Sequence, residues 1–193
     1  MSGKDRYLAV VVNEDGDSGI HILETETGKE IEIPRIPRGT IGDEEPVTWS
    51  EEGYRLLFSF ESGSRIQNIW LLDIEKGILE QVTENEHMTV RQEDLTEPGL
   101  CRYKSFDGLE IPYWLYVPKG IPAGNLPVAV YIHGGPESQI RRFYEETIQY
   151  LVSEGIAVAA PNVRGSTGYG KTYQDLDNKE KRLDAVRDIE ALV

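Results

Sequence analysis

The stretch that decides the fold runs Val128-Ala129-Val130-Tyr131-Ile132-His133-Gly134-Gly135-Pro136, an apolar run that leads directly into a loop of glycine and proline. A second stretch of the same kind follows it, Ile156-Ala157-Val158-Ala159-Ala160-Pro161-Asn162-Val163-Arg164-Gly165-Ser166-Thr167-Gly168-Tyr169-Gly170. Short apolar runs bounded by turn residues are typical of strands covered on both faces. The two stretches therefore predict two buried strands, 128–132 and 156–160, each followed by a loop.

Helices are predicted between and after these strands. One set of residues recurs at helical spacing and is followed by Gly155 where a helix C-cap belongs: Ile140, Phe143, Tyr144, Thr147, Ile148 and Leu151. A second amphipathic helix is predicted to begin near Asp184, with an apolar face of Leu183, Val186, Ile189, Ala191 and Leu192. Upstream, strands 101–106 and 111–117 flank Asp107-Gly108, a strong hairpin signal. Strands that alternate with helices predict an α/β domain with a mostly parallel sheet.

The first of the two loops has a residue pattern with a chemical use. A His-Gly-Gly loop after a central strand contributes a backbone N–H to the oxyanion hole of α/β hydrolases. Glycine suits this position because the backbone must approach the substrate's oxyanion without a Cβ in the way. Taken alone, His133-Gly134-Gly135-Pro136 is equally compatible with a tight turn that has no function.

The first half of the chain repeats itself. The segment 21–28 reappears as 70–77, offset by 49 residues, and the run 7–12 reappears as 55–60, offset by 48. Each unit predicts two strands, a glycine turn and a short third strand, at 30–33 and at 79–82. This period and strand count are typical of a β-propeller blade, although a plain antiparallel meander is the alternative. Because a propeller usually needs four to eight blades, the chain is expected to begin within a propeller.

The density of acidic residues also differs between the two halves of the chain, with a boundary near residue 97. Residues 1–97 hold 22 acidic and 9 basic side chains, whereas residues 98–193 hold 12 and 11. We therefore predict two propeller blades with a linker in 1–97, and the first half of an α/β hydrolase domain in 98–193.

Together, these features resemble the prolyl oligopeptidase family, most closely its acylaminoacyl-peptidase-like and dipeptidyl-peptidase-like branches. That family has a His-Gly-Gly-Pro loop, a helix, a strand and an Asn-x-Arg-Gly-Ser-x-Gly-Tyr-Gly segment in this order. It also places the last propeller blades immediately before the hydrolase domain, and the hairpin 103–112 is similar to the one that leads into that domain. The resemblance covers nearly the whole chain.

The resemblance implies roles for individual residues. Gly135, or else Gly134, would donate its backbone N–H to the tetrahedral intermediate. His133 stands where some branches carry an oxyanion-stabilising tyrosine and is expected to position the loop rather than act as base. Arg164 is expected to anchor its own loop, and the site-supporting residues are then His133, Pro136, Arg164, Gly165 and Tyr169. His21 and His87 are expected to have solvated or structural roles.

No catalytic triad is predicted within the chain. In α/β hydrolases the nucleophile lies in a Gly-x-Ser-x-Gly elbow, followed by the acid and then the histidine. The 193 residues contain no such sequence. We therefore expect the triad beyond Val193 and predict that this chain alone does not hydrolyse substrates. The resemblance implies a serine peptidase that acts on short or N-acylated peptides. The alternatives are an esterase on the same frame and a non-catalytic interaction protein.

Two short motifs point elsewhere and are rejected. Residues 165–172 satisfy the G-x-x-x-x-G-K-[ST] phosphate-loop pattern, but Pro161, Asn162 and Arg164 separate them from the preceding strand. Lys171 is therefore expected to be a solvated surface residue. The sequence Gly16-Asp17-Ser18-Gly19 resembles the nucleophile segment of chymotrypsin-like proteases, but it is predicted to form a hairpin turn within a blade.

The composition bears on the cellular compartment of the protein and on the partners that it can bind. Cys101 is the single cysteine, so no internal disulfide is possible, which suits a reducing cytoplasm. No apolar run approaches the ~20 residues of a membrane span. The net charge of −14 disfavours nucleic acid as a partner. We expect a cytoplasmic protein with short peptides as substrates and without metal or organic cofactor. The resemblance leaves room for a homo-oligomer of the full-length protein.

Overall fold

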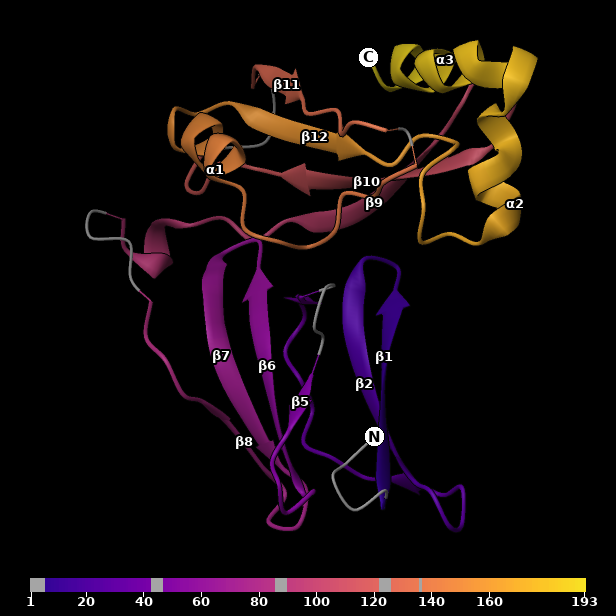
Figure 1. Ribbon diagram of the computed structural model, residues 1–193. Helices are drawn as coiled ribbons and strands as arrows, with labels where there is room; N and C mark the ends of the chain where they lie inside the picture. The colour runs from indigo at the N-terminus through magenta and orange to yellow at the C-terminus, as the bar shows by residue number, and fades with distance from the viewer. Residues whose placement is uncertain (1–5, 43–46, 86–89, 122–125, 136) are drawn as a thin grey trace. The chain divides into compact units, whose positions relative to one another are not determined.

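The computed structural model describes residues 6–42, 47–85, 90–121, 126–135 and 137–193 (Figure 1). The chain forms two compact units. The first comprises Met1–Arg91 with Arg142–Tyr144, and the second comprises Gln92–Arg141 with Glu145–Val193.

The first unit contains two antiparallel sheets. One has the order β1-β2-β3, formed by β1 (Tyr7–Glu14), β2 (Asp17–Glu24) and β3 (Glu30–Ile31). The other has the order β4-β6-β7-β8, with β5 also paired to β6; its strands are β4 (Thr40–Ile41), β5 (Thr48–Trp49), β6 (Arg55–Ser62), β7 (Arg65–Asp73) and β8 (Ile78–Gln81). The turn between β1 and β2 is Asp15-Gly16, so Asp17, Ser18 and Gly19 lie in a strand and not in the predicted turn.

The sequence repeat is also a repeat of strand register. Tyr7 pairs with Glu24 in β1 and β2, and the residues offset by 48 and 49, Arg55 and Asp73, pair in β6 and β7. The outer pairs agree too, since Ile22 faces Ile31 and Leu71 faces Glu80. The predicted pair of three-stranded repeats is therefore confirmed.

Alternating apolar residues of both sheets form the core of the first unit. Its buried members are Tyr7, Ile20, Ile22, Ile41, Leu56, Phe58, Phe60, Leu72 and Ile74. Because side chains point alternately to the two faces of a strand, β6 contributes Leu56, Phe58 and Phe60, and β2 contributes Ile20 and Ile22. The unit is thus held by apolar burial between its sheets.

The second unit is built on one four-stranded sheet of order β11-β12-β10-β9. Its strands are β9 (Gly99–Lys104), β10 (Glu110–Tyr116), β11 (Val128–Val130) and β12 (Ala157–Pro161). Only β11 and β12 are parallel, whereas β10 is antiparallel to both β9 and β12. This part of the sheet is mixed and not mostly parallel as predicted. The reason is that the tight 105–109 turn forces β9 and β10 to be antiparallel, and parallel pairing begins only after the helical crossover.

Burial in this sheet differs between the two predicted buried strands. Every residue of β12 is buried, as predicted. In contrast, β11 lies at the sheet edge, where Val128 is 60% exposed and the following Ile132 is 53% exposed. The prediction that 128–132 is a buried strand is wrong for the residues described.

Short helices complete the second unit: η1 (Gln92–Asp94), α1 (Glu146–Ser153), α2 (Lys171–Gln174), η2 (Asp175–Asp177), η3 (Lys179–Lys181) and α3 (Arg182–Leu192). None of the described helices has the length and apolar character needed to cross a lipid bilayer.

Helix α1 is shorter than the helical spacing from Ile140 predicts. It begins at Glu146, where the Glu145 carboxylate caps it by accepting from the Thr147 N–H. Ile140 is not helical because its backbone N–H donates to Asn162 Oδ1, while its carbonyl accepts from Asn162 Nδ2 and Trp114 Nε1. The end is as predicted, since Gly155 directly follows the C-cap Glu154 and donates to the Val152 carbonyl.

Helix α3 occurs where it was predicted, but its apolar face was assigned wrongly. Leu183 is 72% exposed and Val186 is 50% exposed, whereas Asp188 is completely buried. The side of α3 that packs on the unit is therefore fixed by a carboxylate.

Candidate functional site

Two loops of the second unit lie side by side beyond the ends of β11 and β12. We call residues 131–141 the glycine loop and residues 162–170 the 162–170 loop. The Tyr131 N–H donates to the Ala159 carbonyl at 2.9 Å, which continues the pairing of β11 with β12 into the glycine loop. Further along, the Thr167 N–H donates to the Ser138 carbonyl at 2.9 Å. The structure thus brings the two sequence motifs together.

His133 links the two loops through both ring nitrogens. Nδ1 lies 3.0 Å from the Gly134 carbonyl oxygen, and Nε2 lies 3.0 Å from Ser166 Oγ. Because a carbonyl can only accept, Nδ1 is the donor on that side. Ser166 is fully buried, and its hydroxyl also lies 2.6 Å from the Val163 carbonyl. The imidazole is therefore held between the glycine loop and a fixed point of the neighbouring loop.

Gly135 has a conformation that other residues adopt with difficulty. Its φ is +127°, and a Cβ at this position would lie 2.7 Å from the Glu137 nitrogen. Gly134 has open space around it. The backbone therefore requires glycine at 135 and not at 134. Both remain predicted oxyanion donors, and Pro136 lies outside the described residues.

Asn162 fastens the far end of the glycine loop. Its side chain is completely buried and bonds both backbone groups of Ile140, at 2.7 Å and 2.9 Å. Its Nδ2 also donates to the Tyr169 hydroxyl at 3.0 Å. Tyr169, predicted as a supporting residue, is thus connected to the glycine loop through Asn162.

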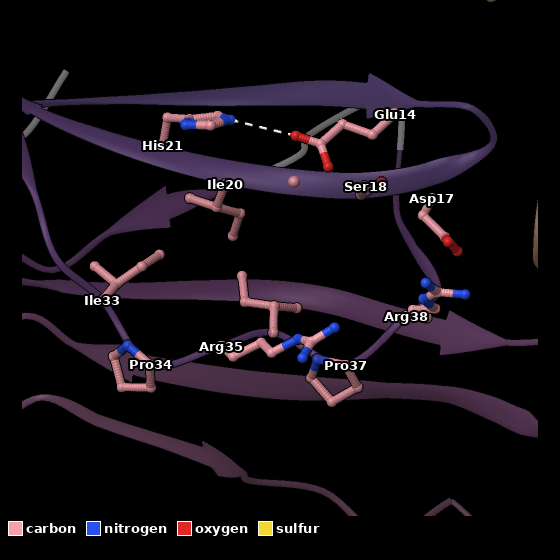
Figure 2. Close-up of a pocket in the computed structure, with 12 residues that line it drawn as sticks. Glu14, Asp17, Ser18, Ile20, His21, Ile33, Pro34, Arg35, Pro37 and Arg38 are labelled. Carbon is pink, nitrogen blue, oxygen red and sulfur yellow. Dashed lines mark ion pairs between the residues drawn. The ribbon is translucent and has the colours of Figure 1, made fainter.

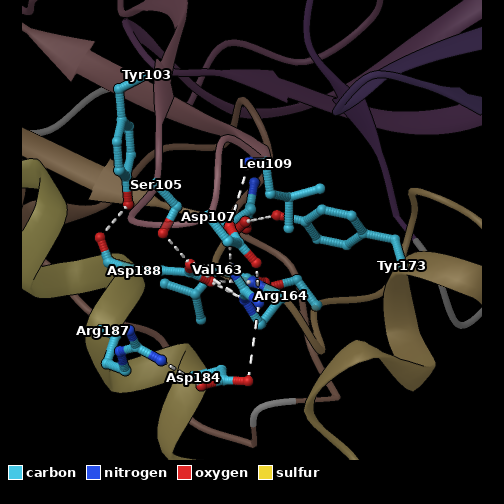
Figure 3. A network of polar contacts seen from close by, with 12 residues as sticks. Tyr103, Ser105, Asp107, Leu109, Val163, Arg164, Tyr173, Asp184, Arg187 and Asp188 are labelled. Atoms are coloured by element: carbon cyan, nitrogen blue, oxygen red, sulfur yellow. Dashed lines mark hydrogen bonds and ion pairs between the residues drawn. The ribbon is translucent and has the colours of Figure 1, made fainter. Parts of the chain in front are cut away.

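Arg164 lies at the centre of a charged network (Figure 3). Its Nε and Nη2 donate to the Asp188 carboxylate at 2.9 Å and 2.8 Å, and Nη1 and Nη2 donate to Asp107 at 2.9 Å and 3.0 Å. The Arg164 backbone N–H and the Ser105 hydroxyl also donate to Asp188. Bidentate pairing of this kind holds a guanidinium in a defined orientation and also stabilises its charge.

Aromatic side chains enclose the network. Two guanidinium groups make cation–π contacts with the Phe106 ring: Arg164 Cζ lies 4.7 Å and Arg187 Cζ 3.3 Å from the ring centroid. The Tyr103 hydroxyl donates to the Asp188 carbonyl at 2.7 Å. Burial raises the pKa of Tyr103, so its hydroxyl stays protonated and able to donate.

Gly165 allows a carboxylate to approach the loop. Its φ is +94°, and a Cβ there would lie 2.5 Å from Asp177 Cγ. Asp177 is itself buried. A carboxylate in this position disfavours a bound phosphate. The Lys171 side chain is 75% exposed, and its Nζ lies 2.8 Å from the Asp175 carboxylate. The geometry of residues 165–172 therefore differs from that of a phosphate loop.

Asp107 gives the network a dependence on pH. The Arg164 guanidinium lowers the pKa of the Asp107 carboxyl from 3.8 to about 2. A lowered pKa in the folded state stabilises the protein above the unfolded value, and this contribution is lost as pH falls from about 4 to about 2. Since the side chain is 42% exposed, solvent screening keeps the contribution below about 1 kcal/mol.

We expect Asp107→Asn to remove this pH dependence. The variant should be slightly less stable than the parent chain at about pH 5, and the difference should shrink toward zero at about pH 2. Urea unfolding of both proteins across this range measures it, with Glu110→Gln, another exposed carboxyl, as the control. A constant difference at all pH values contradicts the assignment.

The sequence reasoning missed three residues that hold the site. Asn162 and Ser166 belong to the motif that was recognised, and their polar character next to a buried strand was the available signal. Asp188 gave no such signal, because an acidic residue in an amphipathic helix is usually placed on the solvated face.

Comparisons with known proteins show which families the chain is similar to. Residues 141–193 match the model of the prolyl oligopeptidase family. The chain is 32% identical over 94 residues to an uncharacterized peptidase of Bacillus subtilis, YuxL, which covers 48% of this chain and 14% of that protein. It is 26% identical over 164 residues to a prolyl endopeptidase of Elizabethkingia miricola, covering 84% and 23%. The chain thus spans less than a quarter of either relative.

Solved structures extend the likeness over nearly the whole chain. A puromycin hydrolase superposes with a TM-score of 0.80 at 26% identity, over 97% of this chain and 28% of that one. An acylaminoacyl peptidase in complex with a peptide chloromethyl ketone superposes with a TM-score of 0.71 at 25% identity, over 97% and 29%. The predicted fold class, propeller blades followed by part of an α/β hydrolase, is confirmed. The match of residues 141–193 to the prolyl oligopeptidase family and the likeness to these solved structures confirm the resemblance predicted from the sequence.

Proposed function

We propose that the glycine loop forms the oxyanion-binding side of a serine peptidase that cleaves short or N-acylated peptides through an acyl-enzyme. The observation that carries this proposal is the fixed peptide plane between Gly134 and Gly135. Because a trans peptide is planar, its C=O and N–H point in opposite directions. The bond from His133 Nδ1 to the Gly134 carbonyl therefore also sets the direction of the Gly135 N–H.

This arrangement suits the first chemical step. A serine hydroxyl attacks the substrate carbonyl carbon, a new C–O bond forms, and the carbonyl π electrons move to the oxygen. The hydroxyl proton passes to a general base. The Gly135 N–H donates to the resulting oxyanion, and a donor fixed beforehand needs no reorganisation during the reaction. His133 is a positioning residue in this mechanism.

The relatives support peptides as the substrate class. The similar solved proteins are a puromycin hydrolase, whose serine-to-alanine variant was solved as a complex, and an acylaminoacyl peptidase with a bound peptide chloromethyl ketone. The first name describes a hydrolase, and the second describes a peptidase of acylated amino acids. We extend this chemistry to the protein to which these residues belong.

The nucleophile is not provided by the 193 residues in this proposal, since they contain no Gly-x-Ser-x-Gly sequence. The chain alone is then inactive. Without a nucleophile, oxyanion donors and binding leave only a small residual rate.

The test uses a polypeptide that carries these residues together with a Gly-x-Ser-x-Gly elbow. We expect it to hydrolyse N-acetyl-alanine p-nitroanilide. Gly135→Ala keeps the N–H, but its Cβ would lie 2.7 Å from the Glu137 nitrogen and would move the donor out of place, so kcat should fall by up to the about 10²–10³-fold that a lost oxyanion donor costs. Gly99→Ala is the control, because a Cβ there meets open space. Unchanged kcat in Gly135→Ala, or labelling of the 193-residue chain by a fluorophosphonate, contradicts the proposal.

A further inference from the structure

A short segment of the first unit, residues 33–38, repeats the tripeptide Ile-Pro-Arg twice: Ile33-Pro34-Arg35-Ile36-Pro37-Arg38. We call it the proline strap. Its exposure has the same period of three, since Arg35 and Arg38 are exposed while Ile33 and Ile36 pack against the core of the unit. Proline-rich segments form a helix with three residues per turn and a rise of about 3.1 Å. The two exposed arginines are three residues apart, which corresponds to one turn and about 9 Å of backbone in this form.

The proline strap and β2 enclose a cavity of about 420 Å³ (Figure 2). Such a volume lies within the range of small-molecule and peptide sites, about 300–1,000 Å³. Its lining is apolar at Ile20, Ile33 and Ile36 and at the two prolines of the strap. All the lining residues belong to the first unit, so the cavity is separate from the site proposed above.

The acidic residues of the lining already have cationic partners. Asp17 accepts from Arg142 Nε at 2.6 Å. Glu14 lies 3.5 Å from His21 Nε2, and Glu30, which is not part of the lining, lies 2.7 Å from Nδ1. These carboxylates, Glu30 above all, raise the pKa of His21, which favours the charged imidazolium between them.

Among the residues that the structure describes, the two strap arginines have no such ion-pair partner. Within ranges 6–42, 47–85, 90–121, 126–135 and 137–193, no acidic side chain forms an ion pair with Arg35 or Arg38. Judged from the described part of the chain, the cavity therefore presents two arginines without an acidic partner, on a protein whose net charge is −14. An anionic ligand is the complementary chemistry.

We propose that this cavity binds an acidic peptide in the polyproline II form, with one carboxylate on Arg35 and a second on Arg38. A guanidinium matches a carboxylate with two parallel hydrogen bonds. In a peptide of polyproline II form, residues three apart lie on the same side and are separated by about 9 Å, which matches the three-residue spacing of the two arginines. The isoleucine and proline lining gives the peptide an apolar surface to cover, which a free phosphate ion does not use. This site goes beyond the proposed peptidase function.

The test measures binding of N-acetyl-Glu-Ala-Ala-Glu-amide to the 193-residue chain by calorimetric titration, with the Gln-Ala-Ala-Gln peptide and inorganic phosphate as comparisons. We expect the glutamate peptide to bind at least about tenfold more tightly than either, because each charged hydrogen-bonded pair adds affinity. Arg35→Gln and Arg38→Gln should each weaken binding about fivefold, and the double variant about 20-fold. Raising the salt concentration from about 20 mM to about 0.5 M should weaken it as well.

Arg65→Gln is the matched control, since Arg65 is exposed and lies outside the cavity. It should bind as the parent chain does. Circular dichroism of every variant reports whether it is folded. A double variant that is folded but does not bind the peptide supports the site. Equal affinity for the two peptides, tighter binding of phosphate, or undiminished affinity in the folded double variant overturns the proposal.

Discussion

Asp188→Ala is expected to destabilise the second unit by about 3–5 kcal/mol. The Arg164 side chain is only 5% exposed, and Asp188 supplies its most deeply buried partner. Removing Asp188 leaves the buried guanidinium with only the partly exposed Asp107 and the more distant Asp184 as counter-charges, and breaking a buried pair in this way is costly. The variant also removes the acceptor for the Ser105 hydroxyl and the Arg164 N–H. Asp188→Asn keeps part of this bonding and should lose less.

The measurement is urea unfolding followed by the fluorescence of Trp114, which is fully buried in the second unit. Trp49→Phe and Trp70→Phe remove the other two tryptophans, both in the first unit. Asp184→Ala is the matched control, because Asp184 is 28% exposed and 4.0 Å from Arg164. We expect it to cost below about 1 kcal/mol. Equal losses for the two alanine variants would show that the buried pair does not support the unit.

Asn162→Ala is expected to destabilise the same unit by about 2–4 kcal/mol and to release the end of the glycine loop. The Ile140 carbonyl keeps its bond from Trp114 Nε1, so it is not orphaned. The Ile140 N–H has Asn162 Oδ1 as its buried acceptor, and an unsatisfied buried donor costs about 1–3 kcal/mol. The cavity left by the amide adds to this cost.

Amide exchange separates this local effect from general destabilisation. The Ile140 amide should be protected in the parent chain and should exchange much faster in Asn162→Ala. Asn178→Ala is the control, because the Asn178 side chain is exposed and bonds only to Asp175. That change should stay within about 0.5 kcal/mol. A protected Ile140 amide in Asn162→Ala is the result that rejects the explanation.

The strands could be predicted because their signals are local. The repeat at 48 and 49 residues predicted the strands of both sheets, and the structure shows in addition that equivalent residues pair in the two sheets. The buried strand β12 and the hairpin of β9 and β10 followed from an apolar run and a turn dipeptide. In each case neighbouring residues carried enough information.

The other features depend on partners that are distant in sequence. The helical spacing predicted a helix from Ile140. The side-chain amide of Asn162, 22 residues away, instead bonds both the N–H and the carbonyl of Ile140. The apolar face of α3 was assigned wrongly because a buried carboxylate is stable only beside Arg164, and nothing in the helix itself indicates that partner. For the site, the glycine loop was identified from its motif, but the link between His133 and Ser166 became visible only with the two loops in place.

The Arg164 network has a consequence for the order of folding. Its partners are separated by long stretches of chain: 57 residues from Arg164 to Asp107, 24 from Arg164 to Asp188, and 83 from Ser105 to Asp188. During synthesis, the arginine emerges from the ribosome before the carboxylate of α3 that neutralises it. The strands can pair earlier, but the guanidinium cannot be buried at low cost until α3 is available. Docking of α3 is therefore a late step, and changes at Asp188 should accelerate unfolding more than they slow folding.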